Sequence, residues 1–259
     1  MRKKVALVLS GGAALGYAHI GVIKQLEENG IPIDMIVGTS MGGLVGAAYA
    51  SGVTYEQMIE IGNKFKTLNL MDINFNKSGL FSGQGIMSKV SKFIPDINIE
   101  DMKIKFACIG CDINGEEEIV YDCGSVLNAV RATISIPGLI VPVKEDRNKF
   151  IVDGGMVNNL PEDVAKAMGA DIIISVDVIQ NYKLIGAPSN VFEAIFHSAN
   201  MLIKEMQKHK KRYYDVLIAP DLTGCKQMIF SQKTLERCVY LGEAETKKNL
   251  DKIKKLLEK

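Results

Sequence analysis

The chain has 259 residues, 47% of them hydrophobic, which is enough to bury the core of one α/β domain. Its 31 Lys and Arg residues nearly balance its 30 Asp and Glu residues, so the protein has no overall field that would attract nucleic acid or strongly acidic substrates. We therefore expect no nucleic-acid partner.

The first fifty residues alternate between apolar runs, glycine-containing turns and helical patterns. Val5–Leu9 and residues 35–37 are typical of buried strands, whereas residues 14–29 and 41–51 have helical periodicity. Val5–Leu9 follows three basic residues, as in a secretion signal, but it is short and runs directly into a glycine turn, so we interpret it as a strand. The alternation predicts a mainly parallel sheet with helices on both faces.

The region after the second helix changes character. Thr54 is expected to cap a helix that extends to about residue 68. The segment 69–90 then mixes polar and glycine residues with apolar ones and has no regular period. Such a segment in a compact domain is typical of a lid or a binding loop, and an ordinary surface connection is the alternative.

The second half of the chain returns to strand and helix patterns without repeats or low-complexity linkers. We therefore predict a single domain over residues 1–259. The predicted strands are 105–109, 118–121, 150–152, 171–176 and 216–219, and the predicted helices are a short one from Val126 and the segments 162–168, 191–213 and 234–258.

Five scattered cysteines indicate a reducing compartment rather than a disulfide framework. Cys108 and Cys111 form a C-x-x-C, but they lie in an apolar run without a second pair at zinc spacing, so we expect buried strand residues and no metal. No apolar run is long enough to span a bilayer. These features predict a cytoplasmic location.

The pentapeptide Gly38-Thr39-Ser40-Met41-Gly42 has the G-x-S-x-G pattern of a nucleophile elbow. It joins a predicted strand to a predicted helix, so Ser40 would project from a tight turn in which the two glycines avoid Cβ collisions. The N–H of Ser40 would also lie at a helix N-terminus, where developing negative charge is favoured. A serine cap between two structural glycines is the alternative.

A second turn of small residues, 10–16, follows the first strand and opens a helix. Several backbone N–H groups can point at one spot there, as the oxyanion of an acyl-transfer intermediate requires. A dinucleotide site is one alternative, but the G-x-G-x-x-G spacing fails because Ala13 stands at the second glycine position. A plain structural turn is the other alternative.

A nucleophilic serine needs a proton acceptor. The chain has three histidines: His197 and His209 lie in a lysine-rich predicted helix, and His19 is expected to pack or hydrogen bond rather than act as a base. Asp153 is the better candidate, because it ends an apolar strand and precedes two glycines that allow close approach to a neighbouring strand end. An ordinary Asp-Gly turn is the alternative.

Together these segments resemble the patatin-like phospholipase family, in the family's order and over about residues 5–180. The matching stretches are 9–21, Gly38-Thr39-Ser40-Met41-Gly42-Gly43 and Asp153-Gly154-Gly155, with the flanking turns 135–138 and 157–161. The combination is specific, although each motif alone is not.

The resemblance implies a three-layer α/β/α sandwich that carries a Ser–Asp dyad. Ser40 would be the nucleophile, Asp153 the base, and the N–H groups of Gly11, Gly12 and Ala13 the oxyanion hole. The family needs no metal or cofactor for hydrolysis.

This chain departs from the family's pattern at two positions of the loop. Leu15 stands where members often carry Arg or Lys, which puts head-group preference or rate in doubt. Ala13 replaces a frequent glycine, and its N–H donates equally well provided that the position does not need a positive φ.

The implied activity is hydrolysis of acyl esters of lipids, of the phospholipase A or lysophospholipase type. The alternatives are an acyltransferase that uses the same dyad, or a catalytically weak regulator that binds lipid or protein. Four apolar residues of the irregular segment are suited to contact an acyl chain, namely Leu70, Phe75, Leu80 and Phe81.

The C-terminal stretch 247–257 is a basic amphipathic helix in sequence. We expect its apolar stripe to pack on the domain with its lysines in solvent. Peripheral contact with anionic lipid is the alternative. Nothing in the sequence indicates an oligomeric state.

Overall fold

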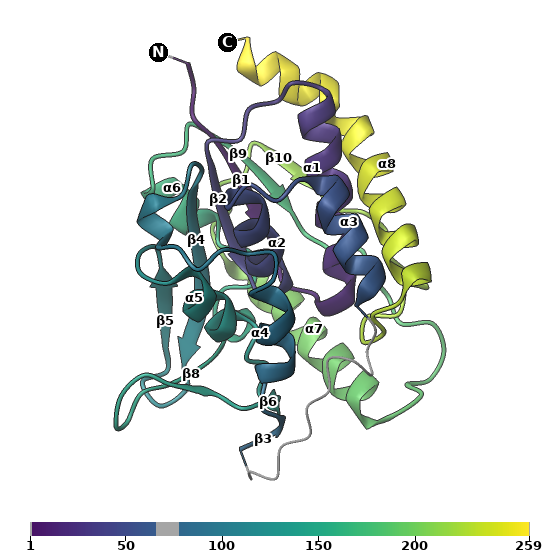
Figure 1. The fold of residues 1–259 in the computed structure, drawn as a ribbon. Coiled ribbons are helices and arrows are strands. Elements are labelled where there is room, and N and C mark those ends of the chain that lie inside the picture. Colours follow the sequence, from purple (N-terminus) through teal and green to yellow (C-terminus); the bar gives the residue numbers. More distant parts are fainter. Residues whose placement is uncertain (1, 66–77, 259) are drawn as a thin grey trace.

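The structure is a computed structural model that describes residues 2–65 and 78–258, and a single large sheet lies at its centre (Figure 1). Five strands are parallel, namely β1 (Val5–Leu9), β2 (Met35–Thr39), β4 (Lys105–Asp112), β9 (Ile172–Val176) and β10 (Val216–Ile218). Three antiparallel strands join on one side, namely β5 (Glu117–Tyr121), β7 (Val143–Lys144) and β8 (Phe150–Asp153). The strand order is β10-β9-β1-β2-β4-β8-β7, with β5 paired to β4. The predicted mainly parallel sheet is confirmed.

Helices cover both faces of the sheet, as predicted, but unequally. One face shares its core with α1 (Ala18–Glu28), α2 (Met41–Ala50), α3 (Tyr55–Lys64), α4 (Gln84–Val90), α5 (Val126–Thr133) and α8 (Gln232–Leu257). The opposite face packs against α6 (Glu162–Ala167). The strands β1, β2 and β4 follow one another in one direction, and the helices that connect them lie on the larger face, whereas β9 returns to the other side of β1.

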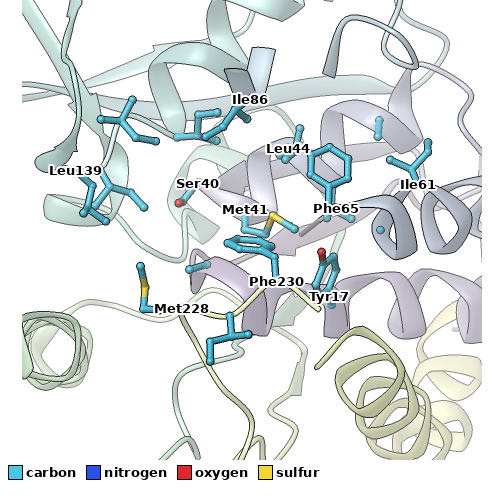
Figure 2. Close-up of a pocket in the computed structure, with 18 of the residues that line it drawn as sticks. Tyr17, Ser40, Met41, Leu44, Ile61, Phe65, Ile86, Leu139, Met228 and Phe230 are labelled. Atoms are coloured by element: carbon cyan, nitrogen blue, oxygen red, sulfur yellow. The ribbon is translucent and has the colours of Figure 1, made fainter. Parts of the chain in front are cut away.

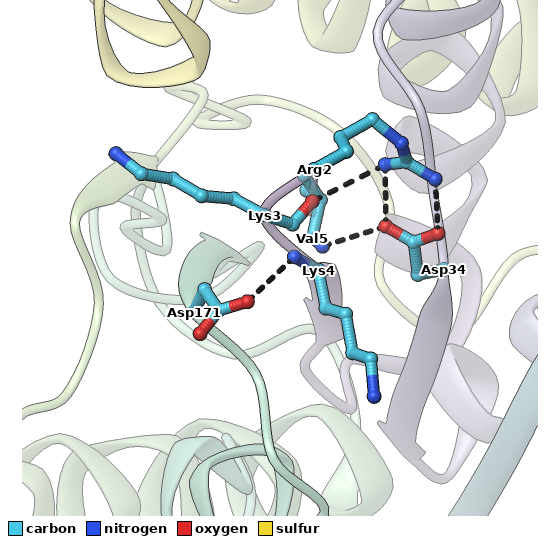
Figure 3. A network of polar contacts seen from close by, with 6 residues as sticks. All are labelled: Arg2, Lys3, Lys4, Val5, Asp34 and Asp171. Carbon is cyan, nitrogen blue, oxygen red and sulfur yellow. Dashed lines mark hydrogen bonds and ion pairs between the residues drawn. The ribbon is translucent and has the colours of Figure 1, made fainter. Parts of the chain in front are cut away.

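The start of β1 is held by a polar network as well as by apolar packing (Figure 3). The Arg2 guanidinium donates to both carboxylate oxygens of Asp34 at 2.8 and 2.6 Å, and Asp34 also accepts the Val5 N–H at 2.8 Å. The Lys4 N–H donates to Asp171 at 2.8 Å. Since Asp34 precedes β2 and Asp171 precedes β9, the network fixes the starts of three adjacent strands.

Several predicted helix boundaries shift in the structure. The first helix opens with a 3₁₀ turn, Ala13–Tyr17, before α1 begins. Thr54 caps α3 in a capping box, as expected, but the helix ends at Lys64. The helix predicted over 191–213 is α7 (Val191–His209), which ends early because Glu162 draws the following residues away. The Glu162 carboxylate pairs with the Arg212 guanidinium at 2.9 Å and accepts a hydrogen bond from the Tyr213 N–H at 2.9 Å.

The segment 69–90 is regular over its second part, so the prediction of an irregular segment is wrong there. Residues 66–77 lie outside the described part of the chain. After them, β3 (Gly79–Phe81) pairs in parallel with β6 (Gly138–Ile140), and α4 follows. The Arg131 side chain braces this region by donating to the carbonyls of Ser82 and Val141, both at 2.8 Å.

The C-terminal helix α8 packs its apolar stripe against α1, as the favoured expectation had it (Figure 1). Two glycines bring the helices together: a Cβ on Gly21 would lie 2.1 Å from the Val239 carbonyl oxygen, and a Cβ on Gly242 would lie 2.2 Å from that of Ala18. The stripe is therefore used inside the domain. Among the described residues, no helix combines the length and the hydropathy needed to cross a bilayer.

Candidate active site

Ser40 lies on a strained turn between β2 and α2, with φ 54° and ψ −124°. The flanking glycines make this turn sterically possible. A Cβ on Gly38 would lie 2.5 Å from the carbonyl oxygen of Gly42, and a Cβ on Gly42 would lie 2.3 Å from that of Leu9. The sharp corner expected from the pentapeptide is therefore present, and both glycine positions exclude larger residues.

The backbone N–H of Ser40 is already engaged, which the sequence did not indicate. It donates to the Thr133 hydroxyl at 2.8 Å, and that hydroxyl donates to the Ile109 carbonyl at 2.6 Å. This N–H therefore does not face developing charge. Thr133 instead links the corner to strand β4, and all three groups are buried.

Replacing Thr133 with valine is expected to lower kcat on a soluble ester about tenfold or more and to reduce the free energy of unfolding by about 1–3 kcal/mol. The change keeps the side-chain shape but leaves the Ser40 N–H and the Ile109 carbonyl without their partner in the core. Steady-state kinetics and urea unfolding measure the two effects. Thr133→Ser is the matched control and should keep both near wild type; equal kcat for the valine and threonine proteins would contradict this role.

Strand β4 brings Ser40 and Asp153 together. Thr39 at the end of β2 pairs with Ile109, and Asp153 at the end of the antiparallel β8 pairs with the next residue, Gly110. The two strands thus meet end to end along one edge of β4. In this arrangement the Ser40 hydroxyl lies near the Asp153 carboxylate and acts on the pKa of that carboxyl as a hydrogen-bond donor would, by lowering it.

The Asp153 carboxylate is almost fully buried, at 6% exposed. Burial raises its pKa to about 6, although hydrogen bonds from the Ser40 hydroxyl and the Gly155 N–H partly oppose the shift. The Gly155 N–H donates to Oδ1 at 2.8 Å, which fixes the carboxylate in place. The group is therefore a stronger base than an ordinary aspartate and still ionised near neutral pH.

The glycine loop presents two backbone donors rather than the three expected. The Gly11 N–H donates to the Asn159 carbonyl at 3.3 Å, whereas the N–H groups of Gly12 and Ala13 have no acceptor among the described residues. Ala13 has φ 49°, so it does occupy the left-handed region that favours glycine. Gly11 remains sterically important, because a Cβ there would lie 3.1 Å from the Ser40 Cβ.

His19 braces this loop instead of contacting the candidate dyad. Its Nε2 donates to the Ser10 carbonyl at 2.8 Å, and its Nδ1 has no hydrogen-bond partner within the described ranges 2–65 and 78–258. Burial lowers the pKa of the imidazole to about 4, so it is neutral at pH 7. The structure thus places His19 in the packing and hydrogen-bonding role that the sequence favoured.

An apolar cavity of about 340 Å³ opens beside Ser40. Figure 2 shows Ser40 among Met41, Ile86 and Leu139, with Phe65 and Tyr17 farther along. The walls come mainly from the 3₁₀ turn, α2, α3, residues 134–140 and the loop 228–230, and Ser40 and Asn190 are among the few polar members. The cavity can therefore hold a hydrocarbon chain next to the serine hydroxyl.

Two of the four predicted chain-contacting residues lie in the described part of the chain, and one of these two lines the cavity. Phe81 does, whereas Leu80 is 45% exposed and is absent from the cavity wall. Leu70 and Phe75 lie outside the described residues. Many of the lining residues that the sequence analysis missed lie on α2 and α3, where apolar positions have the same periodicity as ordinary core residues.

No group of three or more His, Cys, Asp or Glu side chains in the described part of the chain is placed to hold a metal ion. His197 and His209, which the sequence analysis rejected as candidate bases, lie on α7. Neither lines the cavity beside Ser40.

Comparison with known sequences finds one family over most of the folded core. The family model described as "Patatin-like phospholipase" matches residues 7–166. Patatin-like phospholipase domain-containing protein 7 of Rattus norvegicus is 36% identical over 183 residues, covering 67% of this chain and 13% of the relative. Lysophospholipase nte1 of Aspergillus fumigatus is 37% identical over 182 residues, covering 68% of this chain and 12% of the relative. The chain thus spans only a small part of these relatives' length.

Solved structures share the fold at low sequence identity. VipD from Legionella pneumophila superposes with a TM-score of 0.57 and 14% identity, covering 97% of this chain and 67% of VipD. Human GIVD cytosolic phospholipase A2, in complex with methyl γ-linolenyl fluorophosphonate, gives a TM-score of 0.56 and 12% identity, covering 99% of this chain and 58% of that protein.

Proposed function

Because this chain belongs to the patatin-like phospholipase family, we propose that it hydrolyses acyl esters of lipids, as a phospholipase A or lysophospholipase, with Ser40 as nucleophile and Asp153 as base. One observation carries the proposal: the Ser40 hydroxyl lies near a buried carboxylate, that of Asp153, beside an apolar cavity. The arrangement supplies a nucleophile, a proton acceptor and a place for the acyl chain. The reaction also requires a site for the oxyanion, and the N–H groups of Gly12 and Ala13, which have no acceptor among the described residues, can provide it.

In the first step, Ser40 Oγ attacks the ester carbonyl carbon while Asp153 takes the hydroxyl proton. The carbonyl oxygen gains negative charge and accepts hydrogen bonds from the N–H groups of Gly12 and Ala13. The intermediate then collapses: the bond to the alcohol oxygen breaks, and Asp153 returns the proton to the departing alcohol. The acyl group is left on Ser40 and Asp153 is ionised again.

In the second step, Asp153 takes a proton from a water molecule that attacks the acyl–Ser40 ester. The same two N–H groups hold the second oxyanion. Collapse releases the fatty acid, and Ser40 Oγ regains its proton from Asp153. One carboxyl group therefore serves both halves of the cycle.

The lipid nature of the substrate is inferred from the cavity and from the relatives. The wall around Ser40 is almost entirely apolar, so it suits a hydrocarbon chain better than a charged or sugar-like group. A lysophospholipase is among the sequence relatives, and the human structural relative is described with a fluorophosphonate that carries a γ-linolenyl chain. A reagent of that type is a suitable probe of this site.

The test is labelling with an alkyl fluorophosphonate followed by peptide mapping. We expect one equivalent of label on Ser40 in the intact protein and none in Ser40→Ala. Asp153→Asn should label much more slowly, because the hydroxyl then lacks its proton acceptor. Label on a different residue, or no label on a protein that binds the probe's alkyl chain, would overturn the proposal.

The pH dependence should follow the ionisation of Asp153. Only the carboxylate accepts a proton, so kcat/KM on an uncharged soluble ester should fall about tenfold per pH unit below about pH 6 and reach a plateau above it. The midpoint lies well above the ordinary aspartate pKa because the group is buried. A rate that stays constant down to about pH 4.5, in protein shown to remain folded, would exclude this carboxyl as the base.

A further inference from the structure

Helix α7 presents a row of large apolar side chains to solvent. Only Asn200 of its 19 residues is buried. Six of its apolar residues are between 43% and 71% exposed, namely Val191, Phe192, Ile195, Met201, Leu202 and Met206. We call these six residues the α7 face. α7 differs in this from α8, which turns its apolar stripe inward onto α1.

The α7 face is continuous with the wall of the cavity that holds Ser40. Phe192 belongs to both, and Ile229, which is 47% exposed, lines the same cavity from the neighbouring loop. Figure 1 shows α7 at the lower edge of the molecule, on the side where the small β3–β6 sheet lies. The exposed apolar surface of α7 therefore adjoins the wall of the cavity that leads to Ser40.

We propose that the α7 face docks this protein on a lipid surface, with the helix lying in the interface and the mouth of the cavity opening toward the acyl chains. The proposal rests on the function proposed above, since it assigns the surface from which the substrate enters. Amphipathic helices with exposed large apolar residues bind membranes in this orientation. An apolar patch of this kind on a soluble domain marks an interaction surface.

The shared residues identify the occupant as lipid rather than protein. A protein partner seated over Phe192 and Ile229 would cover the cavity mouth, whereas a bilayer covers the same residues and supplies acyl chains to the cavity. The exposed positions of residues 191–202 carry no charge, so neither electrostatic attraction nor repulsion dominates there. Binding should therefore depend on apolar burial and persist at high salt.

The test is sedimentation with phosphatidylcholine vesicles, using Ser40→Ala protein so that no lipid is consumed. We expect the Ser40→Ala protein to sediment with vesicles at low and high salt. Adding the two substitutions Ile195→Gln and Leu202→Gln to this protein should weaken its partitioning onto vesicles about tenfold or more. Neither residue lines the cavity. Tyr240→Gln is the control, because Tyr240 is 69% exposed but lies on α8.

The outcomes separate this inference from the proposed activity. The double variant Ile195→Gln/Leu202→Gln, made in protein that retains Ser40, should hydrolyse a short water-soluble ester at the wild-type rate. It should lose activity only on vesicles. Failure to sediment, or equal sedimentation of the double variant, overturns the docking role even if the esterase is active. The docking role is also overturned if the protein forms a dimer without lipid and the double substitution makes it monomeric, because the face would then be covered by a second copy. Vesicle binding by a protein that hydrolyses no ester would leave docking standing and remove the proposed activity.

Discussion

Replacing Ser40 with alanine, or Asp153 with asparagine, is expected to lower kcat on a short acyl ester by about 10⁴-fold or more. In the proposed mechanism, alanine removes the attacking oxygen, and asparagine removes the carboxylate that accepts its proton. Because the two side chains act in one step, the double variant should be no slower than the worse single variant. Steady-state kinetics measure this, with circular dichroism to show that each variant folds. Additive losses would mean that the two residues act independently.

The same Asp153→Asn change should make the protein more stable at alkaline pH. Burial raises the folded-state pKa from 3.8 to about 6, so the folded protein holds this proton more tightly than the unfolded chain does. The folded wild type therefore loses stability as the pH rises from about 4 to about 6, and above pH 6 the loss is on the order of 3 kcal/mol. We expect Asp153→Asn to exceed wild type by about that amount at pH 8. The advantage should shrink as the pH falls through 6 and vanish below about pH 4; urea unfolding at several pH values measures it.

Replacing Gly12 with alanine is expected to lower kcat about 10²- to 10³-fold while leaving the fold intact. The φ of Gly12 is 163°, which lies outside the left-handed region that favours glycine, so φ alone does not exclude alanine. Space does: a Cβ there would lie 2.5 Å from Val178 Cγ2. The loop must shift, and the N–H groups of Gly12 and Ala13 move away from the oxyanion.

This explanation is tested by a second substitution. Val178→Ala removes the methyl group that the new Cβ would strike, so Gly12→Ala/Val178→Ala should recover much of the lost kcat. Val178→Ala alone serves as the control for the packing it removes. If the double variant is as slow as Gly12→Ala, the loss does not come from this collision, and the loop's role in holding charge must be argued differently.

Local features of the fold could be predicted because they depend on neighbouring residues. The strand, turn and helix around Ser40 follow from an apolar run and two glycines within five positions. The end of α7 could not be predicted, because it depends on Glu162, about fifty residues earlier, capturing Arg212 and the Tyr213 N–H. The strand β3 was missed for a similar reason: it exists only where Gly79–Phe81 pairs with β6.

The candidate site divides in the same way. Ser40 and Asp153 each end an apolar strand, so their positions could be inferred, although only the pairing of both strands to β4 brings them together. Thr133 was missed because it lies 93 positions from Ser40 on an apolar helix. The loss of Gly11 as a free donor depends on the Asn159 carbonyl, which no local pattern indicates.

The backbone of Ser40 has a consequence for how such a chain changes over generations. A serine at φ 54° and ψ −124° carries conformational strain of about 1–3 kcal/mol, and glycine would relieve much of it. A lineage that needed only the folded shape would gain stability by drifting to glycine here. Keeping a hydroxyl at this corner therefore requires selection for what the hydroxyl does.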